Sequence, residues 1–316
     1  MTVLQANGSR YPRPSVSPPR GTAAAPIINA LSVDVEDYYQ VGAFARRIAR
    51  GDWDGYPSRV EANTYALLDL FDAAQVRATF FVLGWIAERH PNLVSAIAAR
   101  GHEVASHGYS HTDVSSQSPA AFRADVRHTK HLLEDIIGTA VRGYRAANFS
   151  IGRDSDWAFA ILEEEGYAYS SSVYPMWHHQ NVIELRRRGP FTPERTVELL
   201  EIPLTTVPLL GLDLPCSGGG YFRLLPYGVS RWALRRVNQR ERRPFVFYVH
   251  PWEIDPEQPR IDGLPLKSRL RHYVNLERVE GRLRRLLEEF RWDRVDKVFL
   301  ADASGLMPTW ARRKSA

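Results

Sequence analysis

Two histidines four residues apart, His107 and His111, are the first side chains here whose type and spacing favour chemistry. They directly follow a short strand predicted over His102–Ser106. If the backbone turns helically at this point, both imidazoles lie on one face and can reach the same cation. The pair alone is weak evidence, because two surface histidines also arise by chance. Its position strengthens it, since the catalytic groups of parallel α/β barrels gather where strands end.

Three carboxylates, Asp34, Glu36 and Asp37, stand at the end of the first predicted strand, Ile28–Val35. Crowding of this kind raises some carboxyl pKa values unless a cation or an arginine compensates. A divalent metal held by two histidines and one carboxylate would do so and leave positions open for water and substrate. A second carboxylate would then act as general base on that water. Capping of the following helix is the alternative, and it accounts for one acid but not for three.

A further histidine and an arginine also close predicted strands. His250 ends the apolar strand Phe245–Val249, and beside a metal site it is well placed as the general acid that protonates a leaving amine. Arg145 ends the strand-like stretch Val141–Arg145. It could orient the base carboxylate by a bidentate contact, or it could form a structural ion pair.

The elements that must position these groups alternate between strand and helix. Helices are predicted over Val60–Ala73, Pro119–Ile137, Asp154–Glu165, Val229–Gln239 and Leu276–Phe290. The further predicted strands are Val76–Val82, Tyr167–Val173 and a last short one, Val298–Ala301. This alternation predicts parallel pairing in an α/β fold. After Pro175 the rhythm loosens into an insertion over Trp177–Arg195 and, later, a Pro-rich loop over Pro251–Leu266. One barrel-like domain with a C-terminal extension fits better than two domains.

Composition argues against several other classes of protein. The 316 residues are 44% hydrophobic and 24% charged, with a net charge of +5. The Arg-rich stretches are interpreted as solvated helix faces, because no nucleic-acid-binding motif accompanies them. The single cysteine, Cys216, rules out an internal disulfide and a multi-cysteine zinc site. No apolar run approaches the ~20 residues that span a bilayer. The N-terminus lacks the apolar core of a secretory signal, so a cytoplasmic protein is expected.

Taken in chain order, these motifs resemble those of the polysaccharide deacetylases of carbohydrate esterase family 4, from about Ile28 to Trp252. That family has two carboxylates after its first strand, then a histidine pair, an arginine motif and a late strand that ends in a histidine. The stretch from Phe247 to Leu276 is similar to a bacterial subgroup found with exopolysaccharide and exosortase gene clusters. The resemblance implies an α/β fold, namely a distorted parallel (β/α) barrel of about seven strands with a C-terminal extension.

The resemblance also implies a role for each matching residue. Asp34 matches the catalytic base, Arg145 the arginine that orients it, and His250 the general acid. His107 and His111 match metal ligands. The implied metal is a divalent cation, zinc first, although cobalt, nickel and manganese also suit two histidines and one carboxylate.

The third metal ligand is left open between Glu36 and Asp37. The family commonly has adjacent aspartates, whereas Val35 follows Asp34 here. Strand alternation puts Asp34 and Glu36 on one side and favours Glu36, while a strand that ends early favours Asp37.

Two more departures from the family pattern concern the surroundings of the site. Ala147 stands where the arginine motif usually has a proline. Ser170–Ser172 stand where an acid is expected, so the residue that supports His250 is not identified. Stacking of sugar rings is expected from aromatic residues near the mouth, with core packing as the alternative for each: Tyr38, Tyr39, Tyr109, Trp177 and Trp252.

The leading hypothesis is a metal-dependent hydrolase that removes N-acetyl groups from a sugar or polysaccharide precursor in exopolysaccharide biosynthesis. The expected organisation is a disordered leader over residues 1–26, a deacetylase barrel over 27–260 and a helical extension over 261–316. The expected partner is an N-acetylated carbohydrate, free or lipid-linked, met in the cytoplasm or at the inner face of the membrane. Hydrolysis of another C–N bond, in a cyclic amide, is the first alternative. A non-catalytic carbohydrate-binding barrel is the second.

Overall fold

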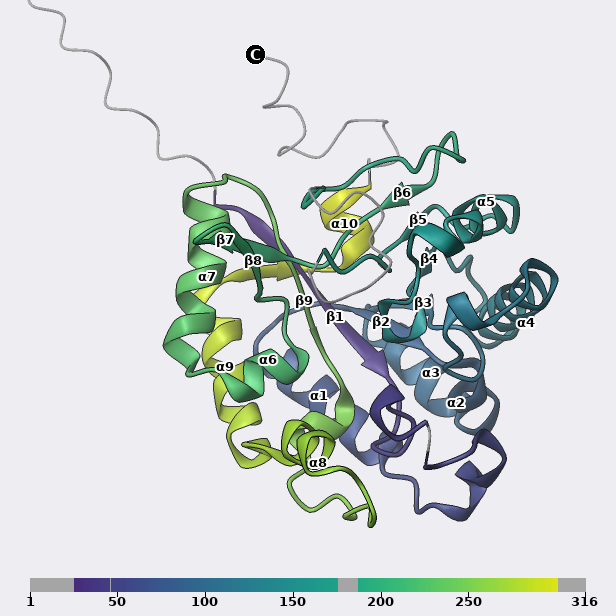
Figure 1. The fold of residues 1–316 in the computed structure, drawn as a ribbon, viewed down its shortest axis with the longest axis horizontal. Helices are drawn as coiled ribbons and strands as arrows, with labels where there is room; N and C mark the ends of the chain where they lie inside the picture. Colours follow the sequence, from purple (N-terminus) through teal and green to yellow (C-terminus); the bar gives the residue numbers. More distant parts are fainter. Residues whose placement is uncertain (1–25, 46, 176–186, 301–316) are drawn as a thin grey trace, which may run out of the picture.

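The computed structural model describes residues 26–45, 47–175 and 187–300. One large parallel sheet runs through them, and helices surround it (Figure 1). Its eight strands in the described residues are β1 (Ile28–Val35), β2 (Thr79–Val82), β3 (Glu103–Ser106), β4 (Gly143–Tyr144), β5 (Tyr169–Ser170), β6 (Leu200–Glu201), β9 (Val246–Val249) and β10 (Arg291–Asp293).

The strand order makes this sheet a parallel half-barrel. Seven strands follow the order β9-β1-β2-β3-β4-β5-β6, and every pairing between them is parallel. The eighth strand, β10, pairs with the start of β1 at Ile28, Asn29 and Ala30. It lies on the same edge of β1 as β2, because β9 occupies the other edge at Ala30. The predicted distorted (β/α) barrel of about seven strands is thereby confirmed.

Helices surround the half-barrel, and the last of them, Val295–Phe299, packs against inward-facing residues such as Ala30 and Phe81 (Figure 1). In the described residues they are α1 (Val60–Ala73), α2 (Gly84–Arg89), α3 (Pro91–Ala99), α4 (Pro119–Ile137), α5 (Trp157–Glu164), α6 (Gly219–Leu224), α7 (Tyr227–Gln239), α8 (Leu266–Tyr273), α9 (Val279–Glu289) and α10 (Val295–Phe299). A search of the same residues for a helix long and apolar enough to span a membrane found none.

Helix α4 shows how local sequence sets an element. Its N-cap, Ser118, accepts a hydrogen bond from the backbone N–H of Ala121, which satisfies one of the free donors of the first turn. Pro119 suits that turn because it has no N–H to leave unpaired. Gly138 ends the helix with a φ of +69°, which an L side chain rarely adopts. The resulting amphipathic helix packs its buried stripe of Phe122, Val126, Thr129 and Leu133 toward the sheet.

The central strand β1 carries the first chemical groups of the chain. Seven of its eight residues are buried, because it has neighbouring strands on both edges. Successive side chains of a strand point to opposite faces, so Ser32 and Asp34 share one face. Both contact Arg145, which is buried inside the half-barrel. The face of β1 that bears Asp34 is therefore the inner one.

The long periodic elements agree with the sequence predictions, as do several short strands, but the last short strand does not. Val60–Ala73 and Pro119–Ile137 are helical as predicted. The predicted strand Val298–Ala301 is wrong over its described part, because residues 298 and 299 belong to α10 and the last strand is β10. The described residues do not include the leader up to residue 25. They also leave out part of the predicted insertion, including Trp177. The segment predicted as a helical extension contributes α8, α9 and α10, and also β10 to the sheet.

A hairpin that the sequence did not predict contains a strained turn. Strands β7 (Thr206–Leu209) and β8 (Leu212–Pro215) pair so that Leu209 faces Leu212 across a two-residue loop. The loop residues Leu210 and Gly211 have φ values of +51° and +79°. Leucine is disfavoured in this left-handed region, and Leu210 has no packing to compensate, since it is 93% exposed.

Replacing Leu210 with asparagine is therefore expected to raise the free energy of unfolding by about 1 kcal/mol, because Asn-Gly is the preferred pair in such turns. Urea unfolding measures the change. Leu212→Asn, an exposed position on the adjoining strand, is the matched control and should give no gain. An unchanged or lower stability for Leu210→Asn would show that the turn is not strained.

Candidate metal centre and active site

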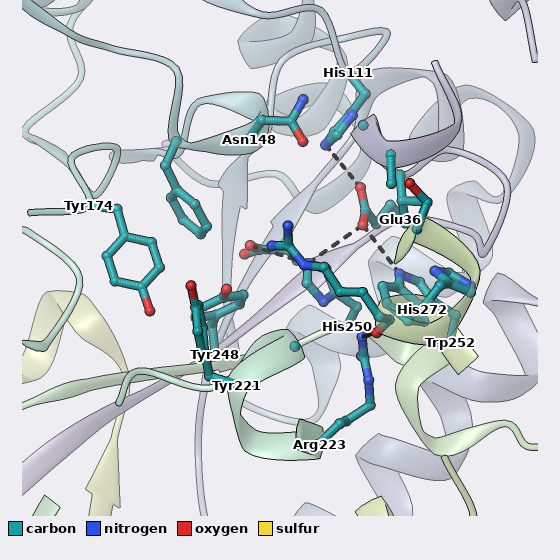
Figure 2. Close-up of a pocket in the computed structure, with 18 of the residues that line it drawn as sticks. Glu36, His111, Asn148, Tyr174, Tyr221, Arg223, Tyr248, His250, Trp252 and His272 are labelled. Carbon is teal, nitrogen blue, oxygen red and sulfur yellow. Dashed lines mark hydrogen bonds and ion pairs between the residues drawn. The ribbon is translucent and has the colours of Figure 1, made fainter. Parts of the chain in front are cut away.

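A cavity of about 480 Å³ opens at the carboxyl ends of the parallel strands. Asp34 reaches it from β1, His107 from the loop after β3, and His250 from the residue that follows β9. Figure 2 shows Glu36, His111 and His250 facing one another across this cavity. The structure thus brings together side chains that are more than 200 residues apart in the sequence.

Glu36, His107 and His111 form a buried cluster whose ligand atoms all lie within 4.8 Å of one another. The Nε2 atom of His111 is 2.9 Å from Oε2 of Glu36. The rings of His107 and His111 have their centroids 5.3 Å apart. Two imidazoles and a carboxylate at this spacing can converge on one divalent cation.

The histidine pair is brought together by a loop and not by the helical turn that the sequence analysis assumed. Gly108 and His111 have φ values of +72° and +50°. Both residues therefore have a left-handed backbone conformation, which a right-handed helical turn does not allow. The loop is fixed by backbone bonds, because the N–H of Gly84 donates to the carbonyl of Gly108 at 2.9 Å. The guanidinium of Arg50 donates to the carbonyl of His111 at 3.0 Å. A left-handed, buried histidine in a well-held loop is typical of a functional site.

The structure places Asp37 outside this cluster. One carboxylate oxygen, Oδ2, accepts bonds from Ser58 Oγ at 2.8 Å and from the backbone N–H groups of Arg59 and Val60 at 2.8 and 3.1 Å. The other, Oδ1, accepts from the N–H of Tyr38. Asp37 therefore caps the start of α1, which is the helix-capping alternative for one of the three acids. Of the two candidate carboxylate ligands, Glu36 is the one near both histidines.

The protonation of the cluster suits a cation. His107 Nδ1 lies 2.8 Å from the carbonyl oxygen of Arg145, so it carries the proton and leaves Nε2 with a free lone pair. Burial lowers the pKa of His107 to about 4, against the attraction of nearby carboxylates. Burial alone would raise the pKa of Glu36, but the imidazoles of His111 and His250 lower it to about 2. A neutral imidazole and an ionised carboxylate are the forms that bind a metal.

Asp34 is held by an arginine that is fully buried. Nη1 of Arg145 donates to Asp34 Oδ1 at 2.6 Å and to Ser32 Oγ at 2.8 Å. The other guanidinium nitrogens, Nε and Nη2, donate to the carbonyl and hydroxyl oxygens of Ser171. The contact with Asp34 is made through one nitrogen, in contrast to the bidentate contact considered from the sequence. It leaves Asp34 Oδ2 facing His250 Nε2, at 4.0 Å.

The partner of His250 is Glu253, which the sequence analysis missed. His250 Nδ1 is 2.5 Å from Glu253 Oε1, across the short 3-10 helix η6 (Pro251–Ile254). Glu253 is in turn paired with the buried guanidinium of Arg223. Burial lowers the pKa of His250, but the carboxylates of Glu36, Glu253 and Asp34 outweigh it and raise that pKa above its ordinary value. The support comes from the residue three positions on, and not from the stretch Ser170–Ser172.

Replacing Glu253 with glutamine is expected to lower the pKa of His250, because one of the carboxylates that stabilise its charged form is removed. An acid must be protonated, so activity is lost as the pH rises through this pKa. The alkaline limb of the kcat–pH profile should therefore move to lower pH by about one unit. The matched control is Glu257→Gln, an exposed carboxylate in the following loop. If Glu253→Gln and Glu257→Gln gave the same kcat–pH profile, Glu253 would not be the residue that raises the pKa of His250.

Five aromatic residues were expected near the mouth of the site. Trp177 lies outside the described residues, and Tyr39 is buried and does not line the cavity. The other three have different surroundings. Trp252 lines the cavity, stacks between His250 and His272, and donates its indole N–H to Glu36 Oε1 at 3.2 Å. Tyr38 is fully buried and is not among the residues that line the cavity. Tyr109 is absent from that lining too, because its hydroxyl donates to Glu88 outside it. The lining contains other rings that the sequence analysis did not single out: Phe149, Tyr174, Tyr221 and Tyr248.

Two segments of the chain are similar to known protein families. Residues 53–169 match the family model described as polysaccharide deacetylase, and residues 171–300 match a domain of unknown function, DUF3473. A peptidoglycan-N-acetylglucosamine deacetylase of Bacillus cereus is 35% identical over 26% of this chain and 30% of that protein. Residues 53–169 of this chain are therefore similar to a polysaccharide deacetylase domain. The matches span about a third of the length of such curated relatives.

Solved structures agree on the fold. A probable polysaccharide deacetylase from Pseudomonas aeruginosa PAO1 aligns with a TM-score of 0.54 at 16% identity, over 83% of this chain and 84% of that one. The PuuE allantoinase aligns with a TM-score of 0.55 at 16% identity, over 89% and 91%. The sheet joins both matched segments, since β9 from the second pairs with β1, which precedes the first.

Proposed function

We propose that this protein is a metal-dependent hydrolase that removes N-acetyl groups from a carbohydrate. The observation that carries the proposal is one cavity that holds the Glu36-His107-His111 cluster together with Asp34 and His250. The deacetylase family match and the names of the curated relatives support it.

Each residue around the proposed metal has a role in this reaction. Asp34, oriented by Arg145, accepts a proton from the attacking water through Oδ2. His250, held through Nδ1 by Glu253, donates a proton from Nε2 to the departing amine. The C–N bond of the acetamide breaks, and acetate and the free amino sugar are the products.

Glu36, His107 and His111 would hold the metal, and this buried set of two imidazoles and one carboxylate fits a divalent cation. The cation would act as a Lewis acid toward the acetyl carbonyl oxygen. Zinc is proposed first because two imidazoles and one carboxylate suit it, with cobalt, nickel and manganese as alternatives.

The finer setting is proposed on sequence grounds alone. The resemblance of residues 247–276 to the exopolysaccharide-associated subgroup favours a polysaccharide precursor, free or lipid-linked, as the substrate. A cytoplasmic site of action, in solution or at the inner membrane face, fits such a precursor.

Acetate release tests the proposal directly. Zinc-loaded protein is incubated with N-acetylglucosamine oligomers and, in parallel, with the cyclic amide allantoin. Release of acetate from the oligomers alone is the expected result. Opening of allantoin instead would favour the cyclic-amide hydrolase, whose fold is similar to this one. Sugar binding without any turnover would favour the non-catalytic barrel.

A further inference from the structure

One arginine on the cavity wall has no acidic partner among the residues that the structure describes. The side chains with full charges that line the cavity are Asp34, Glu36, Arg223 and Arg271. Asp34 is paired with Arg145, and Arg223 with Glu253. Glu36 belongs to the proposed metal cluster and contacts His111. Arg271 makes no ion pair within 4.0 Å to any carboxylate in the described part of the chain. Outside the metal centre, it is a charge on the cavity wall that no described carboxylate compensates.

Arg271 is presented to the cavity by a helix that is anchored. It lies near the end of α8, and Ser268, three residues earlier on the same helix face, lines the cavity as well. Nη2 of Arg223 donates to the backbone carbonyl of Arg271 at 3.1 Å. The backbone of α8 at Arg271 is therefore tied to Arg223, the residue that also holds the partner of His250.

The guanidinium of Arg271 lies beside α6, on the wall that carries the tyrosines. A Cβ atom built at Gly220 would be 3.5 Å from Nε of Arg271, and the next residue, Tyr221, lines the cavity. The charge of Arg271 also acts on the hydroxyl of Tyr248. Figure 2 shows Tyr221 and Tyr248 together, on the side of the cavity opposite His111. A cation and several hydroxyls thus share one wall, away from the metal cluster.

We propose that Arg271 binds an anionic group, carboxylate or phosphate, on the N-acetylated sugar that enters this cavity. The inference rests on the proposed deacetylase function and narrows its substrate class. A guanidinium forms strong, charge-assisted hydrogen bonds with carboxylate and phosphate oxygens. A neutral sugar that covered Arg271 would replace its water only with uncharged hydroxyl oxygens, so it would gain no charge-assisted hydrogen bond there.

Calorimetric titration of the full-length, zinc-loaded protein tests this without turnover. The probes are N-acetylglucosamine methyl glycoside, which is neutral, and N-acetylglucosamine 1-phosphate, N-acetylglucosamine 6-phosphate and N-acetylglucosaminuronic acid. The variants are Arg271→Gln, Arg271→Lys and the matched control Arg269→Gln, an exposed arginine on α8 that does not line the cavity. A phosphate that binds only the metal would bind Arg271→Gln and Arg269→Gln equally.

The expected result is that at least one anionic probe binds the wild type more tightly than the neutral one. Arg271→Gln should weaken that probe by about 10- to 100-fold and leave the neutral probe unchanged. Arg271→Lys should retain part of the higher affinity for the anionic probe, and Arg269→Gln should retain all of it. Which probe responds identifies the group as a carboxylate or a phosphate.

Equal affinities of Arg271→Gln and Arg269→Gln for all four probes would overturn the anion site. Acetate release from the same probes separates this failure from that of the deacetylase proposal. Turnover that is independent of Arg271 overturns the anion site alone. Arg271-dependent binding without acetate release from any probe overturns the deacetylase proposal and leaves the anion site standing.

Discussion

Asp34→Asn is expected to lower kcat for acetate release by about 100- to 10,000-fold, the usual contribution of general acid–base catalysis. The amide has the same shape as the carboxylate and still offers an oxygen to Arg145 Nη1, so the fold and the metal cluster should persist. What it lacks is a basic oxygen in place of Oδ2, the atom that faces His250 Nε2 at 4.0 Å. Acetate release from N-acetylglucosamine oligomers, with metal content measured on the same samples, provides the test.

Asp37→Asn is the matched control, because it removes the neighbouring carboxylate that caps α1 and lies outside the cluster. It should lower stability by about 1 kcal/mol and leave kcat close to the wild-type value. Wild-type turnover in Asp34→Asn, or an equal loss of kcat in Asp37→Asn, would contradict the assignment of Asp34 as the base.

Arg145→Ala is expected to lower the free energy of unfolding by about 3–5 kcal/mol, the usual loss when one partner of a buried ion pair is removed. Arg145 is fully buried, and its removal leaves Asp34, itself 2% exposed, without its cation. It also leaves Ser32 and Ser171 without the donors that cross from β4. Urea unfolding measures the loss.

Arg127→Ala provides the comparison, since its ion pair with Glu165 lies at the surface with the arginine side chain 55% exposed. Such pairs contribute less than about 1 kcal/mol, so this variant should unfold near the wild-type midpoint. Equal losses of unfolding free energy in the two variants would mean that the Arg145–Asp34 ion pair stabilises the fold no more than a surface pair does.

Site residues could be predicted from the sequence where a motif directly follows a predicted strand. His107, His111 and His250 follow predicted strands, and parallel strands place such groups at one edge of the sheet. Strand alternation favoured Glu36, but separating it from Asp37 also required the start of α1, which uses Asp37 as its cap.

Three other features of the site were not predicted, and only the first of them had a signal in the local sequence. Glu253 is three residues from His250, a spacing that a short helix brings into contact, and this spacing was available as a signal. Arg223, its partner, comes from a different helix and had no signal. The directions of aromatic side chains were equally hidden, since Tyr109 turns to Glu88 and Trp252 turns into the cavity.

Short apolar runs misled the fold prediction at the C-terminal end of the described chain. Residues 298–300 are apolar and were predicted as a strand, yet residues 295–299 form α10. Runs of this length fit a buried strand and a buried helix equally well, because periodicity cannot separate them. Long amphipathic helices such as Pro119–Ile137 do not have this ambiguity and were predicted with correct bounds.

The metal content of protein purified without chelator and then supplied with zinc tests the central claim most directly. Wild type and Asp37→Asn should each retain about one equivalent of zinc after dialysis, because one cluster of three ligands is present in the described residues. Glu36→Gln and the double variant His107→Ala/His111→Ala should retain none. Zinc retained by the double variant, or lost from Asp37→Asn and kept by Glu36→Gln, would contradict a metal centre built from Glu36, His107 and His111.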